Sequence, residues 1–198
     1  APLPAARGFL GAATVPDGRV LAIGGTADGA SAQSTVYAYT PATNSWATVA
    51  PLPAARMDLG AATLQDGRVL AIGGYTGSYQ STVYAYTPAT NSWATVAPLP
   101  AARGFLGAAT VPDGRVLAIG GFTGSYQSTV YAYTPATDSW AMVASLPAAR
   151  GYLAAATLQD GRVLAIGGTA DGASAQSTVY RVGVDTGRDV LIGWLASR

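Results

Sequence analysis

The chain of 198 residues contains no cysteine and no histidine. These two absences exclude disulfide bonds, thiolate nucleophiles, histidine general bases and the usual zinc and copper ligand sets. Long apolar runs are also lacking, since no stretch approaches the roughly 20 residues that a membrane-spanning helix needs. We therefore expect no bound metal, no cofactor and no membrane partner.

Charge is scarce too, because only 11% of the residues are charged, against about 25% in an average soluble domain. All eleven cations are arginine and all ten anions are aspartate, which gives a net charge of +1. The chain has no basic block, so we expect no nucleic-acid partner. The first residues lack the charged and apolar regions of a signal peptide, and we expect a mature, cytosolic or trimmed segment.

What the chain has in abundance is repetition. The nine residues Asp-Gly-Arg-Val-Leu-Ala-Ile-Gly-Gly occur four times without a substitution, at 17–25, 66–74, 113–121 and 160–168. Each copy opens on a turn dipeptide, continues through an apolar and β-branched stretch and ends on a glycine pair. That is the pattern of one strand between two sharp reversals. The four copies indicate an architecture of repeated units.

Four strands are predicted in the first repeat, at 9–15, 19–23, 34–40 and 45–49, and a Pro-Leu-Pro linker follows them. No segment of the chain has the periodicity of a helix. A small sheet that is apolar on both faces cannot bury itself alone and has to stack on its copies. The sequence therefore predicts an all-β fold, a β-propeller with four four-stranded blades per chain.

The unit resembles a kelch repeat, similar to those of bacterial kelch and galactose-oxidase-like propellers. The resemblance lies in an arginine before the first strand, the glycine pair, a tyrosine in the third strand and a tryptophan nine residues later. One departure is leucine where many bacterial kelch repeats carry histidine, at Leu10, Leu59, Leu106 and Leu153. The copper chemistry of galactose oxidase is not implied, because its cysteine and histidine ligands are missing. We expect one repeat domain with blades at 1–50, 51–97, 98–144 and 145–198.

The number of blades allows two ways of closing the ring. Propellers contain about four to eight blades, so the chain closes alone or forms half of an eight-bladed ring with a second copy. An open half ring would expose two apolar blade faces, and the chain exchanges no strand between its first and last blades. We therefore favour a homodimer. The atypical tail 181–198 serves as an outer strand, at 190–195, or as a cap or a segment that pairs with another chain.

Variation between the repeats gathers on one face of the predicted propeller. The loops after the glycine pairs have eight residues at 26–33 and 169–176, and six residues with aromatic side chains at 75–80 and 122–127. The linkers before each repeat reach the same face, so a ligand would bind there. The candidate binding residues are linker arginines, loop aromatics and one aspartate that differs between repeats: Arg7, Arg56, Arg103, Arg150, Tyr75, Tyr79, Phe122, Tyr126 and Asp58.

Each kind of candidate residue has two interpretations. The arginines form a ring that holds a carboxylate, phosphate or sulfate, or they tie the blades together through backbone carbonyls. The aromatics, with Phe9, Phe105 and Tyr152 at the rim, stack on sugar rings or peptide side chains, or they pack within the loops. Asp28 and Asp171 are interpreted as loop caps, because one carboxylate per loop is far fewer than the six to eight oxygens of a calcium site.

The residues that differ between repeats include no nucleophile with a neighbouring base, and no second differing acid beside Asp58. We therefore predict that the protein is not an enzyme. The near-identity of the repeats favours a non-catalytic scaffold, amplified or designed, that associates with itself to close a ring. The alternative is a carbohydrate- or peptide-binding module that uses the face rich in arginine and aromatic residues, and a hydrolase or lyase is the least favoured function.

Overall fold

A computed structural model describes residues 1–182 and shows four antiparallel sheets, one for each repeat. The first repeat folds into β1 (Gly11–Thr14), β2 (Val20–Ile23), β3 (Val36–Thr40) and β4 (Ser45–Val49). The second contains β5 (Gly60–Thr63), β6 (Val69–Ile72), β7 (Val83–Thr87) and β8 (Ser92–Val96). The third contains β9 (Gly107–Thr110), β10 (Val116–Ile119), β11 (Thr129–Thr134) and β12 (Ser139–Ser145). The described part of the fourth contains β13 (Ala154–Thr157), β14 (Val163–Ile166) and β15 (Val179–Val182).

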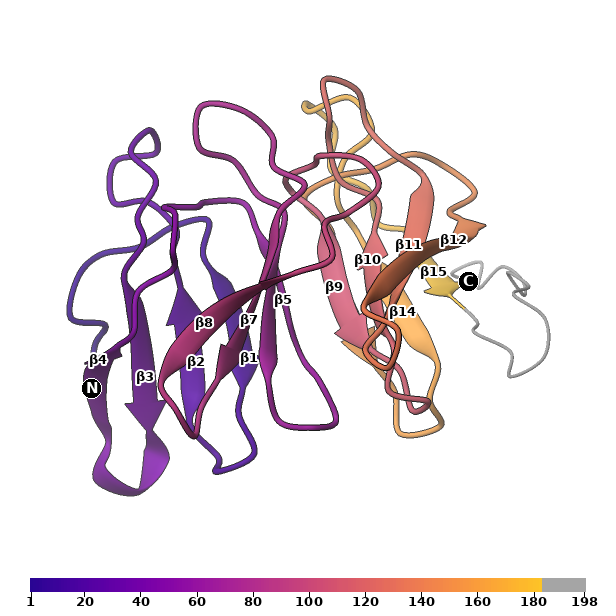
Figure 1. Cartoon of the computed structure of the whole chain (residues 1–198). Helices are drawn as coiled ribbons and strands as arrows, with labels where there is room; N and C mark the ends of the chain where they lie inside the picture. Colours follow the sequence, from indigo (N-terminus) through magenta and orange to yellow (C-terminus); the bar gives the residue numbers. More distant parts are fainter. Residues whose placement is uncertain (183–198) are drawn as a thin grey trace.

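Each sheet runs up and down in chain order, so that consecutive strands are neighbours. Figure 1 shows the four sheets side by side as the blades of a propeller, which confirms the predicted fold class. The only helical segment among the described residues is one short 3₁₀ turn, Pro41–Thr43. The described chain has no helix that is both long and apolar enough to span a membrane. The outer strand predicted at 190–195 lies outside the described residues.

The first strand of the first repeat is shorter than predicted. It was expected at 9–15 in the first repeat, and β1 occupies Gly11–Thr14. The reason is local, because Phe9 has a φ of 55°. A strand requires a negative φ, so extended pairing cannot begin until this residue has been passed.

The innermost strands β1, β5, β9 and β13 lie against one another, and small residues make this approach possible. A Cβ atom added to Gly60 would lie 3.1 Å from the Cβ of Ala108, and one added to Gly11 would lie 3.1 Å from the Cβ of Ala61. A hydroxyl ladder joins the same strands, since Thr63 Oγ1 donates to the carbonyl of Thr14 and Thr110 Oγ1 to that of Thr63, both at 2.6 Å. Such contacts repeat from blade to blade.

The hydrophobic core lies between the blades and not inside any one of them. Three clusters of buried residues each combine one face of a blade with the facing side of the next. Ile23 of the first blade and Val69 of the second share one cluster, and both are fully buried. Ile72 of the second blade and Val116 of the third blade share the next cluster in the same way. A blade is therefore stabilised by burial against its neighbours, as stacked repeats require.

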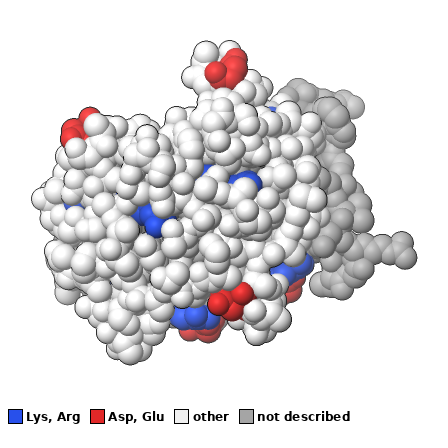
Figure 2. Space-filling model, turned by 45° about the horizontal axis from the view of Figure 1, so that its top comes forward, with Lys and Arg blue, Asp and Glu red and all other residues white. Residues whose placement is uncertain are grey.

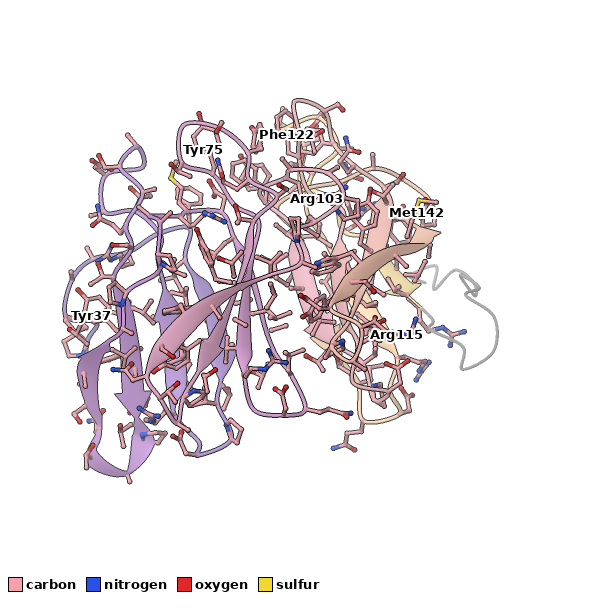
Figure 3. All side chains as sticks on the ribbon, viewed as in Figure 1. Tyr37, Tyr75, Arg103, Arg115, Phe122 and Met142 are labelled. Atoms are coloured by element: carbon pink, nitrogen blue, oxygen red, sulfur yellow. The ribbon has the colours of Figure 1, made fainter. Side chains whose placement is uncertain are left out.

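The two ends of the blades differ in chemistry. At one end lie the Asp-Gly turns, where each aspartate forms an ion pair with the arginine two residues later, as Asp66 does with Arg68. At the other end lie the loops 26–33, 75–80, 122–127 and 169–176 together with the linkers between repeats. We call this end the loop face. Figure 3 shows Tyr75 and Phe122 on the loop face and Arg115 near the opposite end.

Candidate functional site

The linker before each blade runs beside the loop of the same blade. Isolated β-bridges join Gly8 to Thr26, Met57 to Tyr75, Gly104 to Phe122 and Gly151 to Thr169. The linkers and the loops thus share the loop face, where the sequence predicted that they would meet. Any ligand of this face contacts both segments.

The glycine pairs connect successive blades at the base of these loops. Gly24 and Gly25 have φ values of 62° and 86°, which a side chain rarely permits. The N–H of Gly25 donates to the carbonyl of Arg56 at 2.7 Å, across the boundary between two blades. Gly74 and Gly121 make the same bond to Arg103 and Arg150. The glycine pair is therefore a contact between blades as well as a reversal of the chain.

The linker arginines of the second, third and fourth blades are buried. Arg56, Arg103 and Arg150 are only 1–2% exposed. The Nη1 atom of Arg56 donates to the carbonyl of Gly73 at 2.8 Å, and Arg103 and Arg150 repeat this bond within their own blades. In Figure 2, with the loop face turned forward, small blue areas show between uncharged atoms near the middle of the view, and other blue areas lie beside acidic atoms at the lower edge. These guanidinium groups have partners inside the fold, and their binding of an anion stays a prediction.

A tyrosine of the third strand lies under each arginine. The Cζ atom of Arg56 is 4.9 Å from the ring centre of Tyr84, and Arg103 lies 4.6 Å from that of Tyr131. Burial lowers the pKa of both arginines, while the neighbouring tyrosines favour the charged form. The aromatic face thus compensates part of the lost hydration of the cation. Sequence reasoning missed this pairing, although arginine and tyrosine recur at a constant spacing of 28 residues in the middle repeats.

Arg7 differs from the other three arginines, because it precedes the first blade. It is half-buried, and its Nη2 atom donates to the hydroxyl of Thr35 at 2.8 Å. Its Nε and Nη1 atoms are buried and have no hydrogen-bond partner among the described residues, whereas in Arg56 and in Arg150 this holds for the Nε atom alone. The linker arginine at the start of the repeat array therefore has fewer of its donors in hydrogen bonds than the linker arginines of the later blades.

Residues Phe9, Asp58, Phe105 and Tyr152 occupy equivalent places in the four repeats. All four have a left-handed backbone, with φ between 55° and 57°. The N–H of Asp58 donates to the carbonyl of Phe9, that of Phe105 to Asp58 and that of Tyr152 to Phe105, each at 2.8 Å. We call this backbone chain the rim arc. Three of its members are aromatic, and Asp58 is the exception.

A pocket of about 210 Å³ opens at the rim arc. All four rim-arc residues line it, together with Gly29, Met57, Tyr75 and Tyr79. Tyr75 and Tyr79 pack on each other with ring centres 5.2 Å apart, and Phe105 stacks on Tyr152 at 4.0 Å. The pocket thus combines five aromatic rings with the single carboxylate of Asp58. We call it the Asp58 pocket.

The predicted aromatic residues form one continuous cluster, of which only a part lines the Asp58 pocket. Tyr79 packs edge-on against Phe122 at 5.5 Å, and Phe122 packs against Tyr126 at 4.9 Å. Phe122 and Tyr126 are not among the residues that line the pocket. The structure therefore brings Asp58, Tyr75 and Tyr79 together and leaves the arginines beneath them. In Figure 3, Arg103 lies deeper than the labelled loop residues.

Asp58 is the electrostatic exception on the loop face. It is 9% exposed, and burial raises the pKa of its carboxyl to about 6. No hydrogen bond or ion pair from another described residue reaches its side chain. Sequence reasoning named Asp58 because it differs between repeats but missed that it replaces an aromatic residue. An alignment of Arg7-Gly-Phe, Arg56-Met-Asp, Arg103-Gly-Phe and Arg150-Gly-Tyr would have shown it.

The aspartates of the long loops are fully engaged within their own loops. The carboxylate of Asp28 accepts hydrogen bonds from the N–H groups of Ala30 and Ser31 and from the hydroxyls of Ser31 and Thr26. These bonds hold the pKa of Asp28 well below its usual range, and Asp171 repeats the arrangement. Within residues 1–182 no cluster of three or more acidic side chains has the geometry of a metal site.

Comparison with known proteins identifies the repeat. The Kelch motif matches residues 9–53, 59–100 and 105–147, and the fourth repeat carries the same nonapeptide outside the matched ranges. No curated protein matches the chain. Propellers built from this motif are typically scaffolds for protein interactions and are generally not catalytic. With more than half of its length matched and its four blades in place, the chain belongs to the family of Kelch-motif propellers.

Proposed function

We propose that the chain is a non-catalytic scaffold that forms half of an eight-bladed ring, which a second copy completes. In this ring the fourth blade of each chain packs on the first blade of its partner. The observation that carries the proposal is a set of contacts that recurs at every boundary between blades and ends at both outer blades.

The backbone groups at the two ends are complementary. At each internal boundary a glycine N–H donates to an arginine carbonyl, and that arginine's N–H donates to a glutamine carbonyl, as Arg56 does to Gln33 at 3.0 Å. Among the described residues the corresponding groups of the outer blades have no hydrogen-bond partner. On the fourth blade these groups are the N–H of Gly168 and the carbonyls of Gln176 and Tyr152. On the first blade they are the N–H and the carbonyl of Arg7, the N–H of Phe9 and the hydroxyl of Thr14. A partner that repeats the internal boundary satisfies all of them at once.

The side chains of the fourth blade support the same conclusion. Ile23, Ile72 and Ile119 are each fully buried against the next blade. Ile166, at the same place in the fourth blade, is 38% exposed. Exposed isoleucine at the end of a stack is the surface that another blade covers, since open apolar faces favour association.

The test is the mass of the protein in solution by light scattering. We expect twice the 19.9 kDa of one chain. Ile166→Asp places a charge on the free face of the fourth blade and should reduce the mass to that of a single chain. Met142→Asp is the matched control, because Met142 is 64% exposed on the outer strand β12 and takes no part in a boundary between blades. A single-chain mass for the unchanged protein would refute the dimer.

A second candidate function is a carbohydrate- or peptide-binding module on the loop face. The Asp58 pocket favours it, because aromatic walls with one polar group are typical of ligand sites. Binding to a peptide or glycan array that is lost in the double variant Arg56→Ala with Tyr79→Ala would support this function. Because Arg56 also stabilises the fold, the double variant has to keep the circular dichroism spectrum of the parent. If the folded double variant still bound the peptide or glycan as tightly as the parent does, the loop face would not be the binding site.

A further inference from the structure

The strongest unassigned feature of the molecule is the buried carboxylate in an aromatic pocket. Of the side chains that line the Asp58 pocket, Asp58 is the only one with a formal charge, and five are aromatic rings. We propose that this pocket binds a guanidinium group, of the kind that an arginine side chain of a partner peptide presents. The inference names the ligand chemistry of the second candidate function and rests on it.

The first argument is the cost of the unpaired carboxylate. More than nine-tenths of Asp58 is buried, and within residues 1–182 no donor reaches its oxygens. Burial removes part of the water around the carboxylate, so its ionised form loses hydration that the protein does not replace. A bound cation with N–H donors replaces both the charge and the hydrogen bonds that are missing.

The second argument is the nature of the walls. Tyr75, Tyr79, Phe105 and Tyr152 line the pocket together with Asp58, and aromatic rings attract cations. A guanidinium group is planar, stacks on aromatic rings and is more weakly hydrated than an ammonium group. A guanidinium group therefore loses less hydration free energy than an ammonium group on entering the pocket, and it gains more from stacking on the rings.

The volume limits how much of a ligand is enclosed. Pockets that hold whole small molecules measure about 300–1,000 Å³, and the Asp58 pocket measures about 210 Å³. It accordingly encloses the head of a side chain and leaves the rest of the ligand on the loop face. A peptide strand lying along the loops would present an arginine in this way.

Protonation of Asp58 gives the binding a pH dependence that other groups do not share. Its pKa is about 6, so the carboxylate is mostly ionised at pH 7.5 and mostly protonated at pH 5. Burial, with the nearby Asp58 charge, raises the pKa of Tyr79 and of Tyr152, so both phenols stay neutral over this range. Asp28, beside Gly29 of the pocket, has its pKa held low by its own loop and stays ionised. Guanidinium does not titrate here either.

The experiment is a titration of the full chain with N-acetylarginine amide, followed by ligand-observed NMR at pH 7.5. The neutral isostere N-acetylcitrulline amide should bind at least about tenfold more weakly, because it lacks the charge. Affinity for the arginine amide should fall about tenfold between pH 7.5 and pH 5, in proportion to the ionised fraction of Asp58. Equal affinity for arginine and citrulline amides would overturn the proposal, and lysine amide binding as tightly as arginine amide would overturn the choice of guanidinium.

Two pairs of variants separate binding from folding. Asp58→Asn keeps the shape and tolerates the left-handed backbone, so it should fold normally yet lose at least about tenfold in affinity together with the pH dependence. Tyr79→Ala should weaken binding, whereas Tyr126→Ala, at the equivalent place in the next loop and outside the pocket, should not. An unchanged affinity in folded Asp58→Asn would refute the proposal. Binding of a neutral sugar without arginine amide would overturn it too, while leaving the second candidate function in place.

Discussion

The contact between a glycine pair and the next linker gives a sharp test of how the blades meet. Gly120 and Gly167 hold equivalent positions, with φ values of 60° and 63°. A Cβ atom on Gly120 would lie 2.5 Å from the carbonyl oxygen of Arg150 in the next blade. On Gly167 the nearest described atom would be the carbonyl oxygen of Gln176, at 3.3 Å. Gly120→Ala and Gly167→Ala thus share the backbone cost and differ in two neighbours, the Arg150 carbonyl and the Cδ2 atom of Leu153, which would lie 3.1 Å from the Cβ on Gly120.

The expected magnitudes follow from these distances. A left-handed backbone costs alanine about 1–2 kcal/mol relative to glycine in both variants. Gly120→Ala has to displace the Arg150 carbonyl, which accepts the N–H of Gly121 at 2.8 Å. Leaving that buried pair unmade adds about 1–3 kcal/mol. We therefore expect the free energy of unfolding to fall by about 3 kcal/mol in Gly120→Ala and by only about 1–2 kcal/mol in Gly167→Ala when single chains are compared.

In the proposed dimer Gly167 faces the Arg7 carbonyl of the partner and meets the clash that Gly120 meets internally. Two such boundaries close the ring, so a cost of about 1 kcal/mol at each raises the dissociation constant roughly thirtyfold. Urea unfolding measures the first comparison, and light scattering over a dilution series measures the second. An equal loss of stability in the two variants would refute the close approach at Gly120, and an unchanged dissociation constant in Gly167→Ala would refute closure through blade four.

Three further predictions concern the arginines, the hydroxyl ladder and Asp58. Arg103→Ala should lower the free energy of unfolding by about 3 kcal/mol, because it leaves the Gly120 carbonyl without its donor and removes the cation from Tyr131. Arg68→Ala, which breaks a partly exposed ion pair, should change it by no more than about 0.5 kcal/mol in urea. Thr110→Val should cost about 1 kcal/mol through the lost bond to Thr63, while Thr14→Val, whose hydroxyl has no partner among the described residues, should leave a single chain as stable as before and weaken the dimer. Asp58→Asn should stabilise the protein at pH 8 and not at pH 3.5. The pKa of Asp58 in the folded protein is about 6, above the ordinary 3.8, so the aspartate costs stability as the pH rises through this window. The gain in the variant should be about 1–2 kcal/mol, after allowing for the solvent that reaches the carboxylate. Thermal unfolding at the two pH values measures it, and equal gains at both would contradict a buried, titrating carboxyl.

The architecture could be predicted because its signals are local and repeated. The Asp-Gly turn at Asp66, the alternating third strand and the glycine pair each specify their conformation within a few residues. Four copies in register then require stacking. The position of the linkers beside the loops followed from running the strands up and down, and the bridge between Met57 and Tyr75 shows it.

The site could be predicted only in part, because the burial of a side chain and a left-handed backbone conformation both depend on the neighbouring blades. The sequence allowed Arg56 to be an exposed anion ligand or a buried tie, since both uses need the same residue. Only the packing shows that it lies 4.9 Å from the ring of Tyr84 with a carbonyl partner. The left-handed φ of Phe9 had no sequence signal of its own, because glycine, asparagine or aspartate usually marks such a backbone. The shared pocket follows from that conformation.

In the proposed dimer, ring closure and ligand recognition would use different parts of the chain, because the repeats are nearly identical. Every internal boundary uses the same groups, so in the proposed dimer the fourth blade would meet the partner's first blade through the same contacts, and no new kind of interface would be needed. Asp58 does not repeat, and it therefore marks one pocket per chain. An eight-bladed ring of two chains would carry two Asp58 pockets related by the two-fold axis. A partner with two suitably spaced arginines would then bind both pockets, and the second contact would form within the complex at a high effective concentration, so weak pockets would suffice for firm attachment.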